Sequence, residues 1–237
     1  MSEPLPTAPP RVVVVSELTL VAEAVSASLA GADLEAVTMR WPEPHSSARR
    51  GLAPRARQGH GPGIGLMIND LDSWSRLRGA WRLIAEIPLQ WVVLTSTPHG
   101  PMWGAVLEAG AVAVMPGDAH LAAVRAVILS VSRAEEQIAP SERALLTGAW
   151  AELLERLERI GQRIHSLTPR EHEVLTMLHA GHPVASIAQL LEISPATVRS
   201  QVKSVLRKLE VSTQLAAVAA FDDLIAWQRT GPVDVRA

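Results

Sequence analysis

The first half of the chain alternates short apolar runs with amphipathic segments. The apolar runs have the length and β-branched content of buried strands and cover residues 11–16, 34–40, 64–70, 90–95 and 111–115. In segments between or after these runs, apolar residues recur at the spacing of a helix. These segments are residues 18–30, 71–87, 102–109 and 120–133. Apolar strands that alternate with helices predict a parallel sheet covered on both faces. We therefore expect a doubly wound, flavodoxin-like α/β domain over residues 11–134, with its functional groups at the carboxyl ends of the strands.

One unit of this alternation is irregular. Residues 41–62 are rich in Pro, Gly and Arg and have no helical apolar period, so we expect an irregular loop in place of the second helix. Its basic side chains either contact an acidic partner or are simply solvated. They are Arg49, Arg50, Arg55 and Arg57, with Arg40 at the edge of the loop. Residues 1–10 are expected to be disordered.

Residues 135–165 predict a linker helix, with Ser141 as a plausible N-cap. Apolar residues there are spaced by four, three, four, three and four positions, which is a heptad stripe. They are Leu146, Trp150, Leu153, Leu157, Ile160 and Ile164. The stripe is shorter than a secure coiled coil. Two interpretations stay open: a helix packed on its own domain, or a linker that dimerises.

Residues 166–230 predict a helical domain, followed by a tail at 231–237. Thr168-Pro169-Arg170-Glu171 has the pattern of a capping box with Pro at the first helical position. A second helix is expected over Val184–Leu191. Ser194-Pro195 then starts a third helix that runs to about Val211. A helix, a tight turn and a capped helix predict a helix-turn-helix.

The third helix has an apolar side and a basic side. Val198, Val202, Val205, Leu206 and Leu209 have the spacing of a buried stripe. Between Ser194 and Val211 there are four basic residues against one acid, a balance of +3. Such a helix suits the DNA major groove, although an ordinary solvated face is the alternative. The polar and basic residues on the other side are Arg199, Ser200, Gln201, Lys203, Ser204 and Arg207.

Composition narrows the class of protein. Hydrophobic residues make up 48% and charged residues 19% of 237, so the chain can bury a core. The net charge is −2, yet the only two lysines, Lys203 and Lys208, both lie in the third helix. The absence of cysteine excludes disulfides, thiolate metal sites and Cys nucleophiles. No membrane-length apolar run or signal peptide is present, so we expect a cytoplasmic protein without a membrane partner.

The C-terminal segment LTPREHEVLTMLHAGHPVASIAQLLEISPATVRSQVKSVLRKL, Leu167–Leu209, resembles the LuxR/NarL/FixJ-type DNA-binding domain. The resemblance extends through a fourth helix at Gln214–Trp227 and implies that the third helix is the recognition helix. It implies DNA contacts from Thr197, Arg199, Ser200, Gln201 and Lys203, and Arg207 continues their basic side. Glu210 departs from the family, which usually has Gly at that position. Domains of this type bind double-stranded DNA as dimers, so we expect a homodimer.

An α/β domain before such a helix-turn-helix resembles a response-regulator receiver. The resemblance implies a phosphoacceptor at Asp70 and a switch residue at Thr95. The family's acidic pair after the first strand is here Ser16-Glu17, and no Lys stands near Gly117, where the family has one. A metal-binding carboxylate and the lysine are therefore missing, and their loss removes charge compensation from a phosphoryl group. We expect a degenerate receiver without a cofactor, which would need Mg²⁺ only if Asp70 is phosphorylated.

These observations predict a DNA-binding transcriptional regulator that works without phosphorylation and is not an enzyme. One alternative is a response regulator that is controlled by phosphorylation of Asp70. Another is an interaction module that sequesters a second regulator or RNA polymerase, and RNA polymerase is a partner to consider for a true regulator as well. His172, His179 and His182 are better explained as surface residues than as a zinc site. Trp74, Trp81, Trp91 and Trp103 are better explained as core or interface residues than as a ligand pocket.

Overall fold

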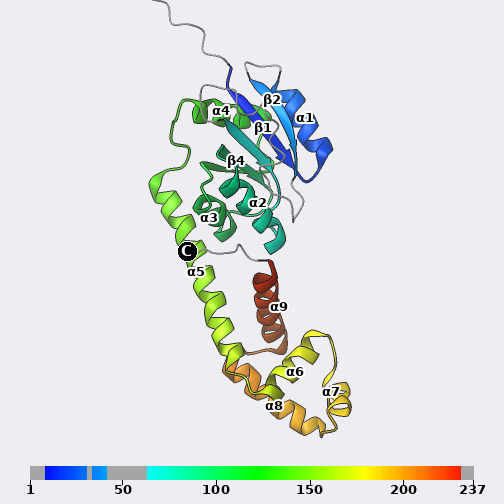
Figure 1. Ribbon diagram of the computed structural model, residues 1–237. Helices are drawn as coiled ribbons and strands as arrows, with labels where there is room; N and C mark the ends of the chain where they lie inside the picture. Colours follow the sequence, from blue (N-terminus) through cyan, green and yellow to red (C-terminus); the bar gives the residue numbers. More distant parts are fainter. Residues whose placement is uncertain (1–8, 31–33, 42–62, 231–237) are drawn as a thin grey trace, which may run out of the picture. The chain divides into compact units, whose positions relative to one another are not determined.

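The computed structural model (Figure 1) describes residues 9–30, 34–41 and 63–230. The predicted tail, the loop from residue 42 to 62 with its four arginines, and residues 1–8 of the predicted N-terminal segment lie outside these described residues. Contacts divide the chain into two compact units. Unit 1 is Met1–Ala151 with Pro232–Ala237, and unit 2 is Glu152–Gly231. The border between them falls inside one helix.

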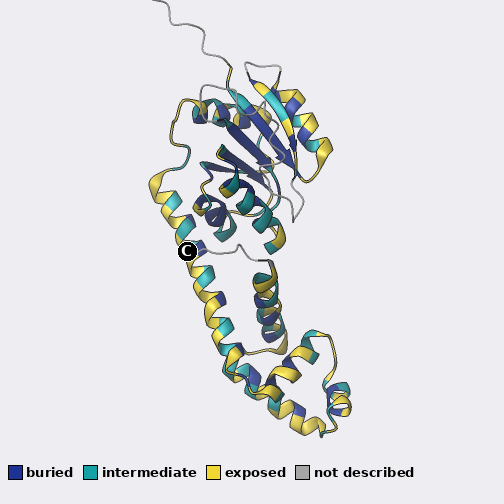
Figure 2. Ribbon diagram, in the orientation of Figure 1, coloured by how far each residue is buried: buried dark blue, intermediate teal, exposed yellow. Residues whose placement is uncertain are grey.

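Unit 1 contains a five-stranded parallel sheet, which confirms the predicted doubly wound fold. The strand order is β2-β1-β3-β4-β5, the flavodoxin-like order. Most strands are largely buried, whereas the edge strand at Glu35–Arg40 is mostly exposed or half-buried, and the helices keep an exposed side (Figure 2). In chain order the elements are β1 (Arg11–Ser16), α1 (Thr19–Leu29), β2 (Glu35–Arg40), β3 (Ile64–Ile68), α2 (Trp74–Glu86), β4 (Gln90–Thr95), α3 (Pro101–Glu108), β5 (Ala113–Pro116) and α4 (Leu121–Ser132).

Alternation along the strands divides the core of unit 1 between the two faces of the sheet. On one face Val12 and Val14 pack with residues of α1 and α4, such as Leu29 and Ile128. On the other face the Trp91 ring covers Gly65 in the neighbouring strand, where a Cβ atom would lie 2.4 Å from the ring. The glycine therefore makes room for the largest side chain of the core.

Three predicted strands differ from the observed ones at their ends. β2 begins at Glu35 rather than at Leu34. β3 ends at Ile68 rather than at Asp70, because the Asp70 carboxylate accepts a hydrogen bond from the Ser96 amide (2.9 Å) beyond the end of β4. β5 begins at Ala113 rather than at Ala111. The Ala111 amide donates to Val106 O (2.9 Å) and closes the end of α3 instead. The differences at β3 and β5 coincide with hydrogen bonds that local sequence patterns do not show.

Helix α5 (Pro140–His165) contributes to the cores of both units. It begins before Ser141, so that residue is not the N-cap that the sequence suggested. Leu146 and Trp150 are buried in unit 1, and the Trp150 ring centroid lies 6.3 Å from those of Trp74 and Trp81. Ile164 is buried in the core of unit 2. These stripe positions are therefore covered by contacts within the chain, as expected of a helix packed on its own domain.

Unit 2 contains the end of α5 and four further helices. They are α6 (Pro169–His179), α7 (Val184–Leu190), α8 (Pro195–Leu209) and α9 (Gln214–Thr230). Two groups of buried apolar residues hold α8 in place. Val198 and Val202 pack with α6 and α7, whereas Val205 and Leu209 pack with α5, α6 and α9. Among the described helices, none is long and apolar enough to cross a membrane.

Candidate nucleic-acid interface

Helix α8 begins as its sequence predicts. The Ser194 hydroxyl accepts a hydrogen bond from the Thr197 amide (3.0 Å), and Pro195 occupies the first helical position. The Ser194 and Thr197 hydroxyl oxygens are also 2.8 Å apart. A side-chain cap satisfies an amide that the helix leaves unpaired and fixes the point where the helix starts. The register of every later side chain on α8 follows from that start.

The exposed side of α8 carries three cations that have no partner among the described residues. We call Arg199, Lys203 and Arg207 the basic row; they follow one another at intervals of four and all are exposed. Ser200 is exposed beside them, and Gln201 is half-buried. Within the described parts of the chain, none of these five side chains has a hydrogen bond or ion pair. Their donors are available to an external anion.

The other two charged residues near the end of α8 are used inside unit 2. Lys208 donates to the Glu171 carboxylate (2.7 Å) and to Ser166 O (3.2 Å). Glu210 pairs with Arg163 of α5. The net charge of +3 therefore lies on the exposed face of α8. It comes from the three residues of the basic row alone. Ser204 turns inward and donates to Glu171 (2.6 Å), so it does not belong to the polar side where the sequence placed it.

Glu171 joins the start of α6 to α8. The predicted capping box is confirmed, with the Thr168 amide donating to the Glu171 carboxylate (2.7 Å) and the Glu171 amide donating to Thr168 Oγ1 (3.3 Å). Burial alone would raise the pKa of Glu171. Hydrogen bonds from Lys208, Ser204 and Thr168 outweigh it and lower the pKa to about 2. Glu171 is therefore an ionised, buried anchor behind the basic row.

The family departure at Glu210 has a local explanation. Glu210 ends α8 in the left-handed conformation (φ 56°), which normally favours glycine. Arg163 pairs with its carboxylate and also donates to Leu209 O (3.3 Å), one of the carbonyls that the helix end leaves unpaired. This arginine offsets the strained conformation and ties the end of α5 to the end of α8.

Two of the three histidines considered as a zinc site, His172 and His179, lie beside other partners. His179 Nε2 is 2.9 Å from Asp222 Oδ1, and both His179 and His172 pack edge-on against Phe221. His182 is exposed. The described residues contain no group of three or more His, Cys, Asp or Glu side chains placed to hold a metal.

A second set of polar residues lies at the carboxyl ends of the strands in unit 1. Asp70 accepts from the Ser96 amide, and the Leu71 amide donates to Thr97 Oγ1 (2.7 Å). Thr95 is buried, and its hydroxyl accepts from the Thr97 amide (3.2 Å). The structure thus brings Asp70 and Thr95 to the same edge of the sheet, as the sequence predicts.

The loops after β1 and β5 carry one acidic residue each at this edge, Glu17 and Asp118, and no basic residue next to either. The Ser16 hydroxyl accepts from the Leu18 amide (3.2 Å) at the start of α1. Glu17 pairs with Arg76 of α2, its Oε2 atom 3.3 Å from Arg76 Nε. Gly117 follows β5, and a Cβ atom there would lie 2.8 Å from Ser96 Oγ. Sequence reasoning did not find Arg76, whose position one helical turn after Asp72 was its only signal.

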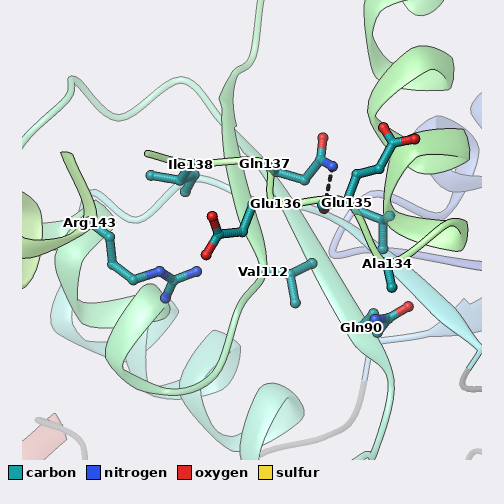
Figure 3. Close-up of a pocket in the computed structure, with 9 residues that line it drawn as sticks. Gln90, Val112, Ala134, Glu135, Glu136, Gln137, Ile138 and Arg143 are labelled. Carbon is teal, nitrogen blue, oxygen red and sulfur yellow. Dashed lines mark hydrogen bonds between the residues drawn. The ribbon is translucent and has the colours of Figure 1, made fainter. Parts of the chain in front are cut away.

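Unit 1 also has a separate cavity of about 200 Å³ (Figure 3). It lies beside Gln90 and Val112, which are at the amino ends of β4 and β5. This is the opposite edge of the sheet from Asp70. Glu136 and Arg143 face the cavity, and Gln137 donates to Glu135 O (2.7 Å). Arg143 already donates to the carbonyls of Leu107 and Ala111 at the end of α3, so its charge serves the packing of α5.

Part of unit 2 is similar to a known protein family. Residues 165–221 match the family described as bacterial regulatory proteins, luxR family. We call this segment the luxR-family domain, after the family that it matches. Its matched residues include the capping box, helices α6 to α8 and the first part of α9. The luxR-family domain therefore contains the basic row and the Glu171 anchor.

Two transcriptional regulatory proteins are similar to this chain over segments longer than the luxR-family domain. A probable transcriptional regulatory protein NarL of Mycobacterium tuberculosis is 27% identical over 134 residues, 56% of this chain and 59% of that protein. The transcriptional regulatory protein DesR of Bacillus subtilis is 34% identical over 97 residues, 41% of this chain and 48% of that protein. The matched region thus spans less than two thirds of either relative.

Solved response regulators also match this chain. RcsB of Salmonella typhimurium covers 91% of this chain and 99% of its own, with 20% identity and a TM-score of 0.43. The response regulator ChrA of a heme-sensing two-component system covers 95% of this chain and 100% of its own, with 20% identity and a TM-score of 0.42. TM-scores as low as these do not support an inference about function.

Proposed function

We propose that this protein is a sequence-specific, DNA-binding transcriptional regulator. The observation that carries the proposal is the basic row of α8, which is exposed, without internal partners in the described chain, and held by a capped and anchored helix. A rigid helix of this kind fits the major groove. The match of residues 165–221 to the luxR family of regulatory proteins supports the same conclusion.

The proposal gives each side chain a role that its chemistry allows. Arg199 and Gln201 read base edges, because guanidinium and amide groups can form paired hydrogen bonds with bases. Lys203 and Arg207 neutralise phosphates, and Thr197 and Ser200 donate to the backbone of the DNA. The protein binds as a homodimer over two half-sites. Because a regulator acts where the DNA is, the proposal includes a cytoplasmic location. Contact with RNA polymerase stays a prediction.

The test removes the basic row one charge at a time. Arg199→Ala and Lys203→Ala should each weaken binding about tenfold or more on fragments recovered by genome-wide DNA capture. Lys203→Ala should also reduce the salt slope by about one unit if the lysine neutralises a phosphate. The matched control is Arg156→Ala, an exposed arginine of unit 2 on α5. Fluorescence anisotropy measures each affinity.

Two results would speak against this function. If both α8 variants bind as tightly as Arg156→Ala, the basic row does not contact DNA. If the chain recovers no genomic fragments at all, the alternative of a module that sequesters another regulator gains support.

We further propose that the receiver-like domain of unit 1 works without a phosphorylation cycle. Ser16 stands where an acid would help to hold Mg²⁺, and its hydroxyl bonds to the backbone instead. Gly117 stands where a cation would be needed, and there is no room for a side chain without displacing Ser96. A phosphoryl group on Asp70 would therefore lack the lysine cation, and one of the carboxylates that would hold a compensating Mg²⁺.

Incubation with acetyl phosphate and Mg²⁺ tests this part of the proposal. We expect substoichiometric labelling of Asp70 in the intact protein, measured by mass spectrometry. DNA occupancy of Asp70→Asn should equal that of the wild type, because the amide oxygen can still accept from Ser96. Stoichiometric labelling, with occupancy that follows it, would instead establish a regulator controlled by phosphorylation.

A further inference from the structure

The receiver resemblance implies a divalent cation at the carboxyl edge of the sheet, and the residues there can be tested for such an ion. Mg²⁺ binds through one or two carboxylates and keeps several waters. Three carboxylates lie in the loops after β1 and β3, on Glu17, Asp70 and Asp72, and a fourth, on Asp118, follows β5.

The side chain of Arg76 already engages two of these carboxylates. Its Nε atom is 3.3 Å from Glu17 Oε2, and its Nη1 atom is 3.0 Å from both carboxylate oxygens of Asp72. One guanidinium thus bridges the loop after β1 and the loop after β3. The third carboxylate, on Asp70, accepts from the Ser96 amide.

The charges around Arg76 also favour its cationic form. The hydrogen bond and negative charge of Asp72 raise the pKa of Arg76 above its usual value, and the charges of Glu17 and Asp70 act in the same direction. A guanidinium cannot lose its proton in this setting. A divalent ion would therefore have to displace a permanent cation. The residues present do not fit Mg²⁺ in the way that the resemblance implies.

We propose that Arg76 is the resident cation of this pocket and takes the place of a divalent metal ion. It connects the loop after β1 to the first turn of α2 and balances the acidic residues that remain. The inference rests on the proposed phosphorylation-independent function and adds a cause to it, because a pocket with a built-in counter-ion needs no metal to hold its loops together.

Metal titration of the full-length protein tests the inference, with Mn²⁺ as the probe and electron paramagnetic resonance to count free ions. The wild type and Arg76→Lys, which keeps a cation, should bind no Mn²⁺ saturably up to about 10 mM. Arg76→Gln should gain a saturable site below that concentration. Adding Glu17→Gln to Arg76→Gln should remove it. The matched control is Arg82→Gln, which breaks an ion pair with Glu86 elsewhere on α2. This variant should show no saturable Mn²⁺ binding.

Two outcomes would overturn the inference: saturable Mn²⁺ binding by the wild type, or a folded Arg76→Gln variant that still binds none. Circular dichroism and the anisotropy assay on DNA establish that each variant is folded. The acetyl phosphate assay is a separate readout. Stoichiometric labelling of the wild type contradicts the proposed phosphorylation-independent function. An Arg76→Gln variant that binds no Mn²⁺ contradicts only the role of Arg76.

Discussion

Replacing Glu171 with alanine should lower the free energy of unfolding of the luxR-family domain by about 3 kcal/mol. The carboxylate accepts from the Thr168 amide, the Ser204 hydroxyl and the Lys208 ammonium group at once. Glu171 is 5% exposed. Without it, the half-buried ammonium group of Lys208 would have no counter-ion. The capping hydrogen bond from the Thr168 amide at the start of α6 would also be lost, and a cap alone contributes about 1 kcal/mol.

Urea unfolding monitored by circular dichroism measures this loss. The control is Glu173→Ala, because Glu173 is an exposed glutamate of the same helix, paired only with Arg170. A surface pair of this kind contributes less than about 1 kcal/mol. We also expect DNA affinity to fall in the Glu171 variant, since Lys208 and Ser204 hold the inner side of α8. Equal stability of the two variants would show that the anchor contributes nothing.

The same carboxylate predicts how stability depends on pH. In the folded protein the pKa of Glu171 is about 2, below its ordinary value of 4.5. Its contribution is therefore fully present above pH 4.5 and is lost as the pH falls from 4.5 towards 2, because only the unfolded chain binds the proton in that interval. Glu171→Gln should flatten the decline in stability over this range. If the stability of Glu171→Gln declines as steeply as that of the wild type, other acidic residues cause the loss of stability in this pH range.

Local patterns were enough to predict the elements that depend on neighbours in the sequence. The strand at Gln90–Thr95, the capping box at Thr168 and the N-cap at Ser194 were all predicted and all observed. A cap needs only residues three positions apart, and a buried strand needs only an apolar run. The buried stripe of α8 follows for the same reason.

Tertiary partners could not be predicted in this way. Ser204 and Lys208 reach Glu171 across more than 30 positions of sequence, so the pattern of α8 alone placed Ser204 on the wrong side. Arg76 is similar, because its contact with Glu17 depends on how α2 packs beside the loop after β1. Which polar residues remain free for a ligand is decided by such long-range pairs.

Gly104→Ala should destabilise unit 1 by about 3 kcal/mol by forcing the first half of α5 away from α3. A Cβ atom at Gly104 would lie 2.0 Å from the carbonyl oxygen of Leu146 and 2.6 Å from its carbon. Both are backbone atoms, so no side-chain rotation can relieve the overlap. The helix itself must move, and Leu146 and Trp150 would lose their burial.

Gly148→Ala is the matched control, because Gly148 lies in α5 itself and a Cβ atom there meets nothing within 4 Å. That change should be neutral or stabilising by up to about 1 kcal/mol, since alanine is the better helix former. Hydrogen exchange at residues 140–151 and a red shift of tryptophan fluorescence measure the separation. Protection in Gly104→Ala equal to that in Gly148→Ala would show that α3 and α5 do not pack this closely. A helix that rests on the backbone of its neighbour leaves no room for a partner there, so any dimer contact of α5 has to use a different side of the helix.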